Sequence, residues 1–221
     1  AKNDPNVLNN FYLTVSLSDS FMSSLEHNGV YQLLDPVSGE AIEDIPAEPI
    51  FEAIVDASWR NGDPGVIFAD TIARDNPVPE LGQFGAVSGC GEQIMIEHES
   101  CFLGSINLAA MITHQQQNPA SVDWEKLGDT VDTAVRFLDN TYEASTFASE
   151  KIARVSKLGR KIGLGVMGLG DAFYILQIPY NSEKAVEITR EIVAYIKRRA
   201  YSCSEALAKE KGSCPVFSSA S

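Results

Sequence analysis

The residue in this sequence whose surroundings best suit chemistry is Cys90, which stands in the segment Ser88-Gly89-Cys90-Gly91-Glu92. Glycines on both sides permit backbone torsions and close approaches that a Cβ would prevent, so the thiol can lie at the tip of a tight loop and face a ligand. Glu92 is close enough along the chain to act on the same ligand as a general base or acid. We therefore predict one loop that presents a thiol and a carboxylate to a shared ligand.

A second thiol, Cys101, follows in a segment of mostly small and apolar residues. Residues 93–98 have an apolar centre that predicts a strand, and this strand would return Cys101 toward Cys90. Such a layout favours a radical or redox thiol site over a structural bridge. The alternative is that both cysteines are small buried hydrophobic residues, and spacing leaves it open because contact between two sulfurs depends on Cα separation and direction.

Two motifs in this region resemble those of the ribonucleotide reductase catalytic subunit. The family pattern N-P-C-G-E-Q corresponds to residues 88–93, and its C-N-L-G-S-I-N-L pattern corresponds to residues 101–108. The resemblance covers nearly the whole chain, because further family segments are recognisable at 62–68, 76–82 and 162–172. The form of the two cysteine motifs is similar to that of the adenosylcobalamin-dependent class II enzymes.

This resemblance implies a fold and a site. The fold is α/β, and residues 1–221 would be a single segment of the ten-stranded α/β barrel of the reductase, with Cys90 on the finger loop that threads the barrel centre. The resemblance also implies that Ser88, Gly89, Cys90, Gly91 and Glu92 contact the ribonucleotide substrate. It assigns no metal-binding residue to this chain.

The resemblance further implies a radical reduction that uses adenosylcobalamin as cofactor. Cys90 would become a thiyl radical and take the 3′ hydrogen of the substrate, while Glu92 accepts the proton of the 3′ hydroxyl and the 2′ hydroxyl leaves as water. Cys101 would be one of two thiols that reduce the sugar and end as a redox-active disulfide. The second thiol lies upstream in the family and is not in this chain, and a thioredoxin-type protein would be the reductant.

The chain departs from the family pattern at Ser88 for Asn, Gly89 for Pro and Phe102 for Asn. The first departure bears on chemistry, because the Asn of the family hydrogen-bonds the substrate sugar. A serine hydroxyl has a shorter reach and lacks the NH₂ donors of Asn. Losing one such contact typically costs a few kcal/mol, on the order of tenfold to several hundredfold in rate.

Composition predicts a soluble globular protein without a nucleic-acid or membrane partner. The chain has 221 residues, of which 44% are hydrophobic and 21% charged, and its formal net charge is −13. This charge argues against binding to a nucleic-acid backbone or a polybasic contact with a membrane, because little positive charge is available to neutralise phosphates. No apolar run approaches the roughly 18 residues of a membrane helix. We expect a cytoplasmic protein that keeps its cysteines as thiols unless catalysis oxidises them.

The sequence begins without Met and ends in an unfinished-looking segment, so we expect it to be part of a longer polypeptide. Activity would then require the remainder of the reductase chain or a second subunit. The competing function is a non-catalytic or complementing barrel fragment that serves a partner polypeptide. Because a piece of a closed barrel exposes strand edges, this alternative predicts association of the isolated chain.

Periodicity and capping residues predict an alternation of strands and helices. We expect strands at 11–17, 31–34 and 41–45, the last two as a hairpin, a helix from Ser18 or Asp19 to about residue 27, and a helix at 48–60. Further predictions are loop and short strand at 62–82 and a surface loop at 115–121. A helix at 124–142, capped by Asp123, would carry a buried apolar stripe, and a long helix capped by Asn181 or Ser182 would run to about residue 211.

Glycines at 163, 165 and 168 fit the dinucleotide-binding fingerprint in their spacing. The fingerprint expects a full buried strand before its first glycine, and here only Ile162 stands as an apolar residue before it. We therefore favour a glycine-lined junction between a strand and a helix, with a nicotinamide-dependent dehydrogenase as the alternative. Cys203 and Cys214 repeat the spacing of Cys90 and Cys101 without comparable neighbours, and we interpret that repeat as coincidence.

Overall fold

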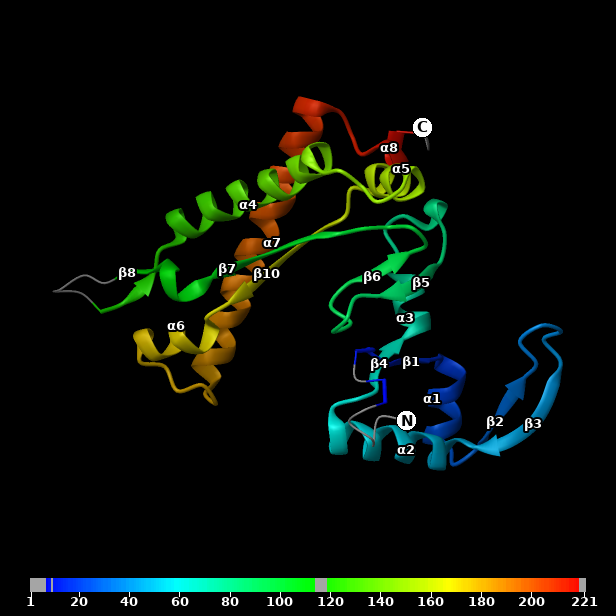
Figure 1. The fold of residues 1–221 in the computed structure, drawn as a ribbon. Helices are drawn as coiled ribbons and strands as arrows, with labels where there is room; N and C mark the ends of the chain where they lie inside the picture. The colour runs from blue at the N-terminus through cyan, green and yellow to red at the C-terminus, as the bar shows by residue number, and fades with distance from the viewer. Residues whose placement is uncertain (1–6, 9, 114–118, 219–221) are drawn as a thin grey trace. The chain divides into compact units, whose positions relative to one another are not determined.

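A computed structural model describes residues 7–8, 10–113 and 119–218 (Figure 1). The chain forms two compact units, Ala1–Glu97 and His98–Ser221. Both units mix helices and strands, which confirms the predicted α/β class. Within the described residues the strands pair as five two-stranded sheets, none of which closes on itself. The ten-stranded barrel and the assignment of the whole chain to a single barrel segment stay predictions.

The first unit is organised around a parallel pair of strands, β1 and β4. Their registered residues run from Thr14 opposite Gly65 to Leu17 opposite Phe68. The elements of this unit are β1 (Thr14–Leu17), α1 (Asp19–Glu26), β2 (Val30–Leu34), β3 (Ala41–Pro46), α2 (Ala47–Asn61), β4 (Gly65–Phe68), α3 (Ala69–Arg74), η1 (Pro79–Leu81), β5 (Phe84–Val87) and β6 (Ile94–Ile96).

Local signals explain most of these boundaries. The Ser18 side chain accepts a hydrogen bond from the Phe21 amide and begins α1, as expected of an N-cap serine. Gly62 ends α2 at a φ of 80°, a conformation that glycine adopts at little cost. The predicted β2–β3 hairpin and both helices are confirmed, whereas the strand predicted at 11–17 occupies only Thr14–Leu17.

The short strand predicted within residues 62–82 is confirmed as β4, but residues 69–74, predicted as loop, form helix α3. The Asp70 carboxylate accepts a hydrogen bond from the Asp19 amide at 2.7 Å, and the Arg74 guanidinium pairs with the Asp19 carboxylate at 2.6 Å. These contacts attach α3 to the start of α1. They come from tertiary packing, which overrides the turn-rich local composition.

The second unit is organised around another parallel pair, β7 and β10, in register from Phe102 opposite Ile162 to Asn107 opposite Met167. The elements of this unit are β7 (Phe102–Asn107), η2 (Leu108–Met111), β8 (Ile112–Thr113), β9 (Ser121–Val122), α4 (Trp124–Ala144), α5 (Glu150–Gly159), β10 (Ile162–Met167), α6 (Leu169–Leu176), α7 (Glu183–Lys211) and α8 (Pro215–Ser218). Residues 115–118 of the loop predicted at 115–121 lie outside the described residues.

The core of this unit lies between α4, α7 and the two parallel strands. The stripe predicted on α4 is buried at Leu127, Val131, Val135, Leu138 and Tyr142. Helix α4 begins at its predicted cap Asp123, and α7 begins at Ser182, one of the two caps predicted for it, while the sequence did not predict α5. No helix within the described ranges is long and apolar enough to cross a membrane.

The glycines at 163, 165 and 168 form the predicted junction between a strand and a helix. Gly163 and Gly165 lie inside β10, and only Gly168, at a φ of 72°, lies in the turn before α6. A Cβ at Gly168 would lie 2.4 Å from the Asn107 Oδ1 atom, so packing between η2 and α6 requires a glycine there. A dinucleotide fingerprint needs its first glycines after the strand, where backbone N–H groups face a phosphate. The dehydrogenase alternative is therefore not supported.

Candidate functional site

The five site residues predicted around Cys90 lie in one turn at the tip of the β5–β6 hairpin. The two strands are antiparallel, and residues 88–93 connect them. The Ser88 amide donates to the Gln93 carbonyl and the Gly91 amide donates to the Ser88 carbonyl, both at 2.9 Å. Gly91 has a φ of 74°, which favours glycine at that position. We call this segment the 88–93 turn, and its closure leaves the Cys90 thiol free and exposed.

Glu92 is directed back toward the residue that carries the thiol. Its Oε2 atom accepts a hydrogen bond from the Cys90 amide at 3.1 Å. Hydrogen bonding from the Ser88 side chain, followed by backbone N–H groups, lowers the pKa of the Glu92 carboxyl below its ordinary value. Glu92 is therefore a carboxylate at neutral pH, which is the state that can accept a proton.

Ser88 has a structural role in the turn that its comparison with Asn did not suggest. Its Oγ atom accepts a hydrogen bond from the Gln93 amide at 2.9 Å and lies 3.3 Å from the Gln93 carbonyl oxygen, a second acceptor, besides Glu92, that its one hydroxyl hydrogen can reach. Serine hydroxyls commonly close short turns in this way. The same residue thus links closure of the turn to the ionisation of Glu92.

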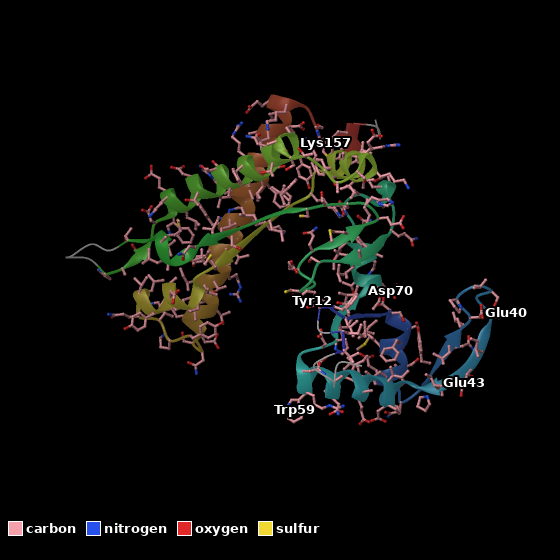
Figure 2. The ribbon with its side chains drawn as sticks, viewed as in Figure 1. Tyr12, Glu40, Glu43, Trp59, Asp70 and Lys157 are labelled. Carbon is pink, nitrogen blue, oxygen red and sulfur yellow. The ribbon has the colours of Figure 1, made fainter. Side chains whose placement is uncertain are left out.

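Tyr12 is a neighbour of the turn that sequence reasoning missed. Its ring lies against Gly89, where a Cβ would come within 3.1 Å of Cε2 and 3.2 Å of Cδ2 (Figure 2 labels Tyr12). Tyr12 as a whole is 72% exposed. Tyr12 falls within the strand predicted at 11–17, and no local pattern relates it to residue 89. The glycine at this position accommodates the tyrosine ring.

We expect Gly89→Ala to disturb the 88–93 turn by pushing the Tyr12 ring aside. The free energy of unfolding should fall by roughly 1 kcal/mol, the usual cost of modest overpacking. Removing the ring in Tyr12→Ala/Gly89→Ala should recover most of that loss, which gives a coupling energy of about 0.5–1 kcal/mol in a double-mutant cycle. Urea denaturation of the intact protein measures both values.

Gly85→Ala is the matched control for this prediction. Gly85 lies in β5 of the same hairpin, and a Cβ there meets nothing within 4 Å. This change should leave stability within about 0.5 kcal/mol of the starting protein. Additive effects of Tyr12→Ala and Gly89→Ala would show that the ring does not constrain the turn.

Cys101 lies in the second unit, at the residue before β7, and is half-buried. Burial raises the pKa of its thiol, the Glu99 carboxylate raises it further, and the Lys161 ammonium lowers it. Cys101 therefore carries its proton at neutral pH. Cys90 belongs to the first unit, so an approach of the two sulfurs stays a prediction.

Tyr142 holds the backbone around Cys101. Its buried hydroxyl lies within hydrogen-bonding distance of two carbonyl oxygens, that of Ser100 at 3.1 Å and that of Lys161. The rings of Tyr142 and Phe102 pack edge to face, with their centroids 4.7 Å apart. The Ser100 amide in turn donates to the Ser156 Oγ atom at 2.9 Å. The residues on both sides of Cys101 are thus fixed by α4 and α5.

The other two cysteines serve packing in the second unit. The Cys203 thiol donates to the Asp132 carbonyl at 3.5 Å, and the Cys214 thiol donates to the Leu158 carbonyl at 3.0 Å. Burial raises the pKa of both thiols. Neither environment resembles the exposed turn of Cys90, and this difference agrees with the interpretation of their spacing as coincidence.

Comparisons with known proteins relate the whole chain to one enzyme family. The family described as "Ribonucleotide reductase, barrel domain" matches residues 1–221. The chain is 40% identical over 213 residues to the vitamin B12-dependent ribonucleoside-diphosphate reductase of Mycobacterium tuberculosis, an alignment that covers 96% of this chain and 30% of that protein.

Two further relatives agree with this match. The vitamin B12-dependent ribonucleoside-diphosphate reductase of Thermoplasma acidophilum is 40% identical over 96% of this chain and 27% of its own length. The ribonucleoside-diphosphate reductase large chain of Neurospora crassa is 28% identical over 91% of this chain and 24% of its own length. The chain thus spans less than a third of the length of each of these relatives.

Proposed function

The chain belongs to the ribonucleotide reductase barrel-domain family, and on this premise we propose that the protein reduces ribonucleotides to 2′-deoxyribonucleotides. The observation that carries the proposal is the 88–93 turn, in which an exposed thiol and an ionised carboxylate are held within one short loop. The thiol can give up a hydrogen atom, and the carboxylate can accept a proton from the same bound sugar.

Each residue has a distinct part in this reaction. Cys90, as a thiyl radical, takes the 3′ hydrogen of the ribose, and Glu92 accepts the proton of the 3′ hydroxyl. Cys101 and a second thiol supply two electrons and two protons, so that the 2′ C–O bond is replaced by C–H, water leaves and a disulfide forms. Ser88 and the glycines on either side of Cys90 line the contact with the substrate.

Adenosylcobalamin is the cofactor that suits these residues, because relatives at 40% identity are named vitamin B12-dependent. The exposed thiol of Cys90 is compatible with a bulky group, and a Cβ at Gly91 would meet nothing within 4 Å, so the turn offers an open approach. The cofactor, when bound, supplies the one-electron oxidation of the Cys90 thiol. Cys90 and its two glycine neighbours are the described residues that would face it.

The partners follow from the balance of the reaction. The substrate is a ribonucleoside di- or triphosphate, and a thioredoxin-type dithiol protein returns two electrons and two protons to the disulfide that contains Cys101. A cytoplasmic location provides such a reductant, and this location stays a prediction.

A complementing role for a second polypeptide is the other candidate function. Leu103, Val166 and Met167 lie on the β7–β10 strands with 50%, 39% and 55% of their surface exposed. Apolar side chains on strands with open edges suit further barrel strands, from the same polypeptide or from a second subunit. An isolated 221-residue chain that is monodisperse, and whose melting transition is unaffected by such a partner, would contradict this role.

Turnover by the intact protein tests the main proposal. With adenosylcobalamin, a dithiol and each ribonucleoside di- or triphosphate in turn, we expect 2′-deoxynucleotides by chromatography, and Cys101→Ser should reduce multiple-turnover product by about a hundredfold or more. Cys203→Ser is the control and should retain activity, because that thiol lies outside the proposed site. Equal product from the Cys101→Ser and Cys203→Ser variants would contradict the assignment of Cys101.

A further inference from the structure

A buried ion pair lies beside Cys101, and the mechanism described above does not use it. The Lys161 Nζ atom is 2.6 Å from the Glu99 Oε2 atom, and the two side chains are 14% and 1% exposed. Removing both charges from water is costly and is often not repaid in stability by their attraction. Stability alone therefore does not account for a buried pair of this kind.

Strand pairing brings this ion pair to the thiol. Cys101 directly precedes β7 and Lys161 directly precedes β10, and the first residues of these parallel strands, Phe102 and Ile162, are in register. Glu99 stands just before Cys101 on the same segment. The Tyr142 hydroxyl, between the carbonyls of Ser100 and Lys161, holds the two strand starts together. Thiol, carboxylate and ammonium are therefore fixed at one end of the parallel pair.

The remaining titratable groups near this end are engaged elsewhere. Burial raises the pKa of Tyr142, which keeps its hydroxyl neutral. Arg160 is paired with Asp139 at 2.8 Å and with Glu143 at 2.5 Å, and the Cys214 thiol donates a hydrogen bond to the Leu158 carbonyl. Of the charged groups, Glu99 and Lys161 act directly on Cys101, and they shift its pKa in opposite directions.

We propose that the Glu99–Lys161 ion pair sets the charge state of the Cys101 thiol, with Lys161 favouring the thiolate and Glu99 favouring the protonated thiol. Both are positioning residues, and their part in turnover rests on the proposed function of Cys101. When a dithiol protein reduces the disulfide, two electrons pass from the dithiol to the disulfide, the dithiol becomes a disulfide, and its two protons end on the released sulfurs. Lys161 stabilises Cys101 as a thiolate during this exchange, and Glu99 restores the resting thiol.

Alkylation of Cys101 in the intact protein tests this proposal without substrate or cofactor. Iodoacetamide reacts with the thiolate, so the rate at which the Cys101 peptide is labelled, followed by mass spectrometry across pH, reports the charge state. Glu99→Gln should increase the rate near pH 7.5 by about three- to tenfold, and Lys161→Gln should decrease it by a similar factor, as expected for one nearby charge. Lys161→Arg should stay close to the starting protein.

The labelling rate is expected to rise in Glu99→Gln and to fall in Lys161→Gln, and this opposition distinguishes an electrostatic role from a structural one. Loosened packing would expose Cys101 and accelerate labelling in both glutamine variants, and this result would overturn the proposal. Lys157→Gln is the matched control, because Lys157, labelled in Figure 2, lies on α5 of the same unit. Its partner Glu143 is exposed. Labelling of Cys214 in the same samples should not change.

The double variant Glu99→Gln/Lys161→Gln removes both charges and should bring labelling back toward the starting rate. A double variant as fast as Glu99→Gln alone would contradict a charge-based effect of Lys161. Opposite shifts in a protein that fails to reduce ribonucleotides would refute the proposed function and leave this inference standing. Normal turnover with labelling unchanged in all variants would refute the inference alone.

Discussion

Cys90→Ser is expected to lower deoxynucleotide formation by the intact protein by about three orders of magnitude or more. Serine is similar in shape, but its O–H bond is stronger than the S–H bond, so the hydroxyl does not carry the radical. Cys90 is exposed at the tip of the 88–93 turn, and its replacement should leave the free energy of unfolding within about 0.5 kcal/mol. Product formation and a urea melt on the same preparation check both parts.

Cys203→Ser is the control that shows whether the loss of activity depends on Cys90 itself. Cys203 is a partly buried thiol on α7, so its replacement removes a sulfur without touching the turn. Activity of the Cys90→Ser variant within about tenfold of the starting protein would mean that another group takes the 3′ hydrogen. Loss of activity in both variants would point to a general requirement for thiols rather than to residue 90.

Glu92→Gln is expected to lower the rate by about two to four orders of magnitude, the usual contribution of a general base. Glutamine keeps an oxygen that can accept the hydrogen bond from the Cys90 amide, so the turn should persist while proton acceptance is lost. Single-turnover product formation measures the effect. Glu97→Gln is the control, because Glu97 is exposed just beyond β6 of the same hairpin.

The pH dependence of the reaction gives a second measurement on Glu92. A base works only when ionised, so activity falls as pH drops through the pKa of the base. Ser88 makes the largest contribution to lowering the pKa of Glu92, which places this acid limb at lower pH than for an ordinary glutamate. Ser88→Ala should therefore move the acid limb to higher pH, and an unmoved limb would exclude Glu92 as the titrating base.

Ser88→Asn addresses the departure from the family pattern at the same position. If the sugar contact limits the reaction, restoring Asn should raise deoxynucleotide formation. The serine also closes the turn through Gln93, so the comparison must be made on folded protein. No increase in rate would show that Ser88 is not the limiting difference.

The sequence predicted the parts of this protein that depend on short stretches of chain. Ser18, Gly62, Asp123 and Ser182 define helix ends because caps act within one turn of helix. The buried stripe of α4 follows from helical spacing alone. Helix α3 was missed because its contacts with Asp19 come from a distant part of the chain.

By itself the sequence determined the α/β class, the reductase family and the turn that joins Cys90 to Glu92, because motifs and turns consist of neighbouring residues. Only the tertiary structure decided that Tyr12 lies on Gly89 and that Lys161 lies beside Cys101. The second of these follows from the parallel pairing of β7 with β10, two strands that share one core with α4. Contacts of this kind join residues far apart in the chain and form only in the folded core, so local sequence patterns do not predict them.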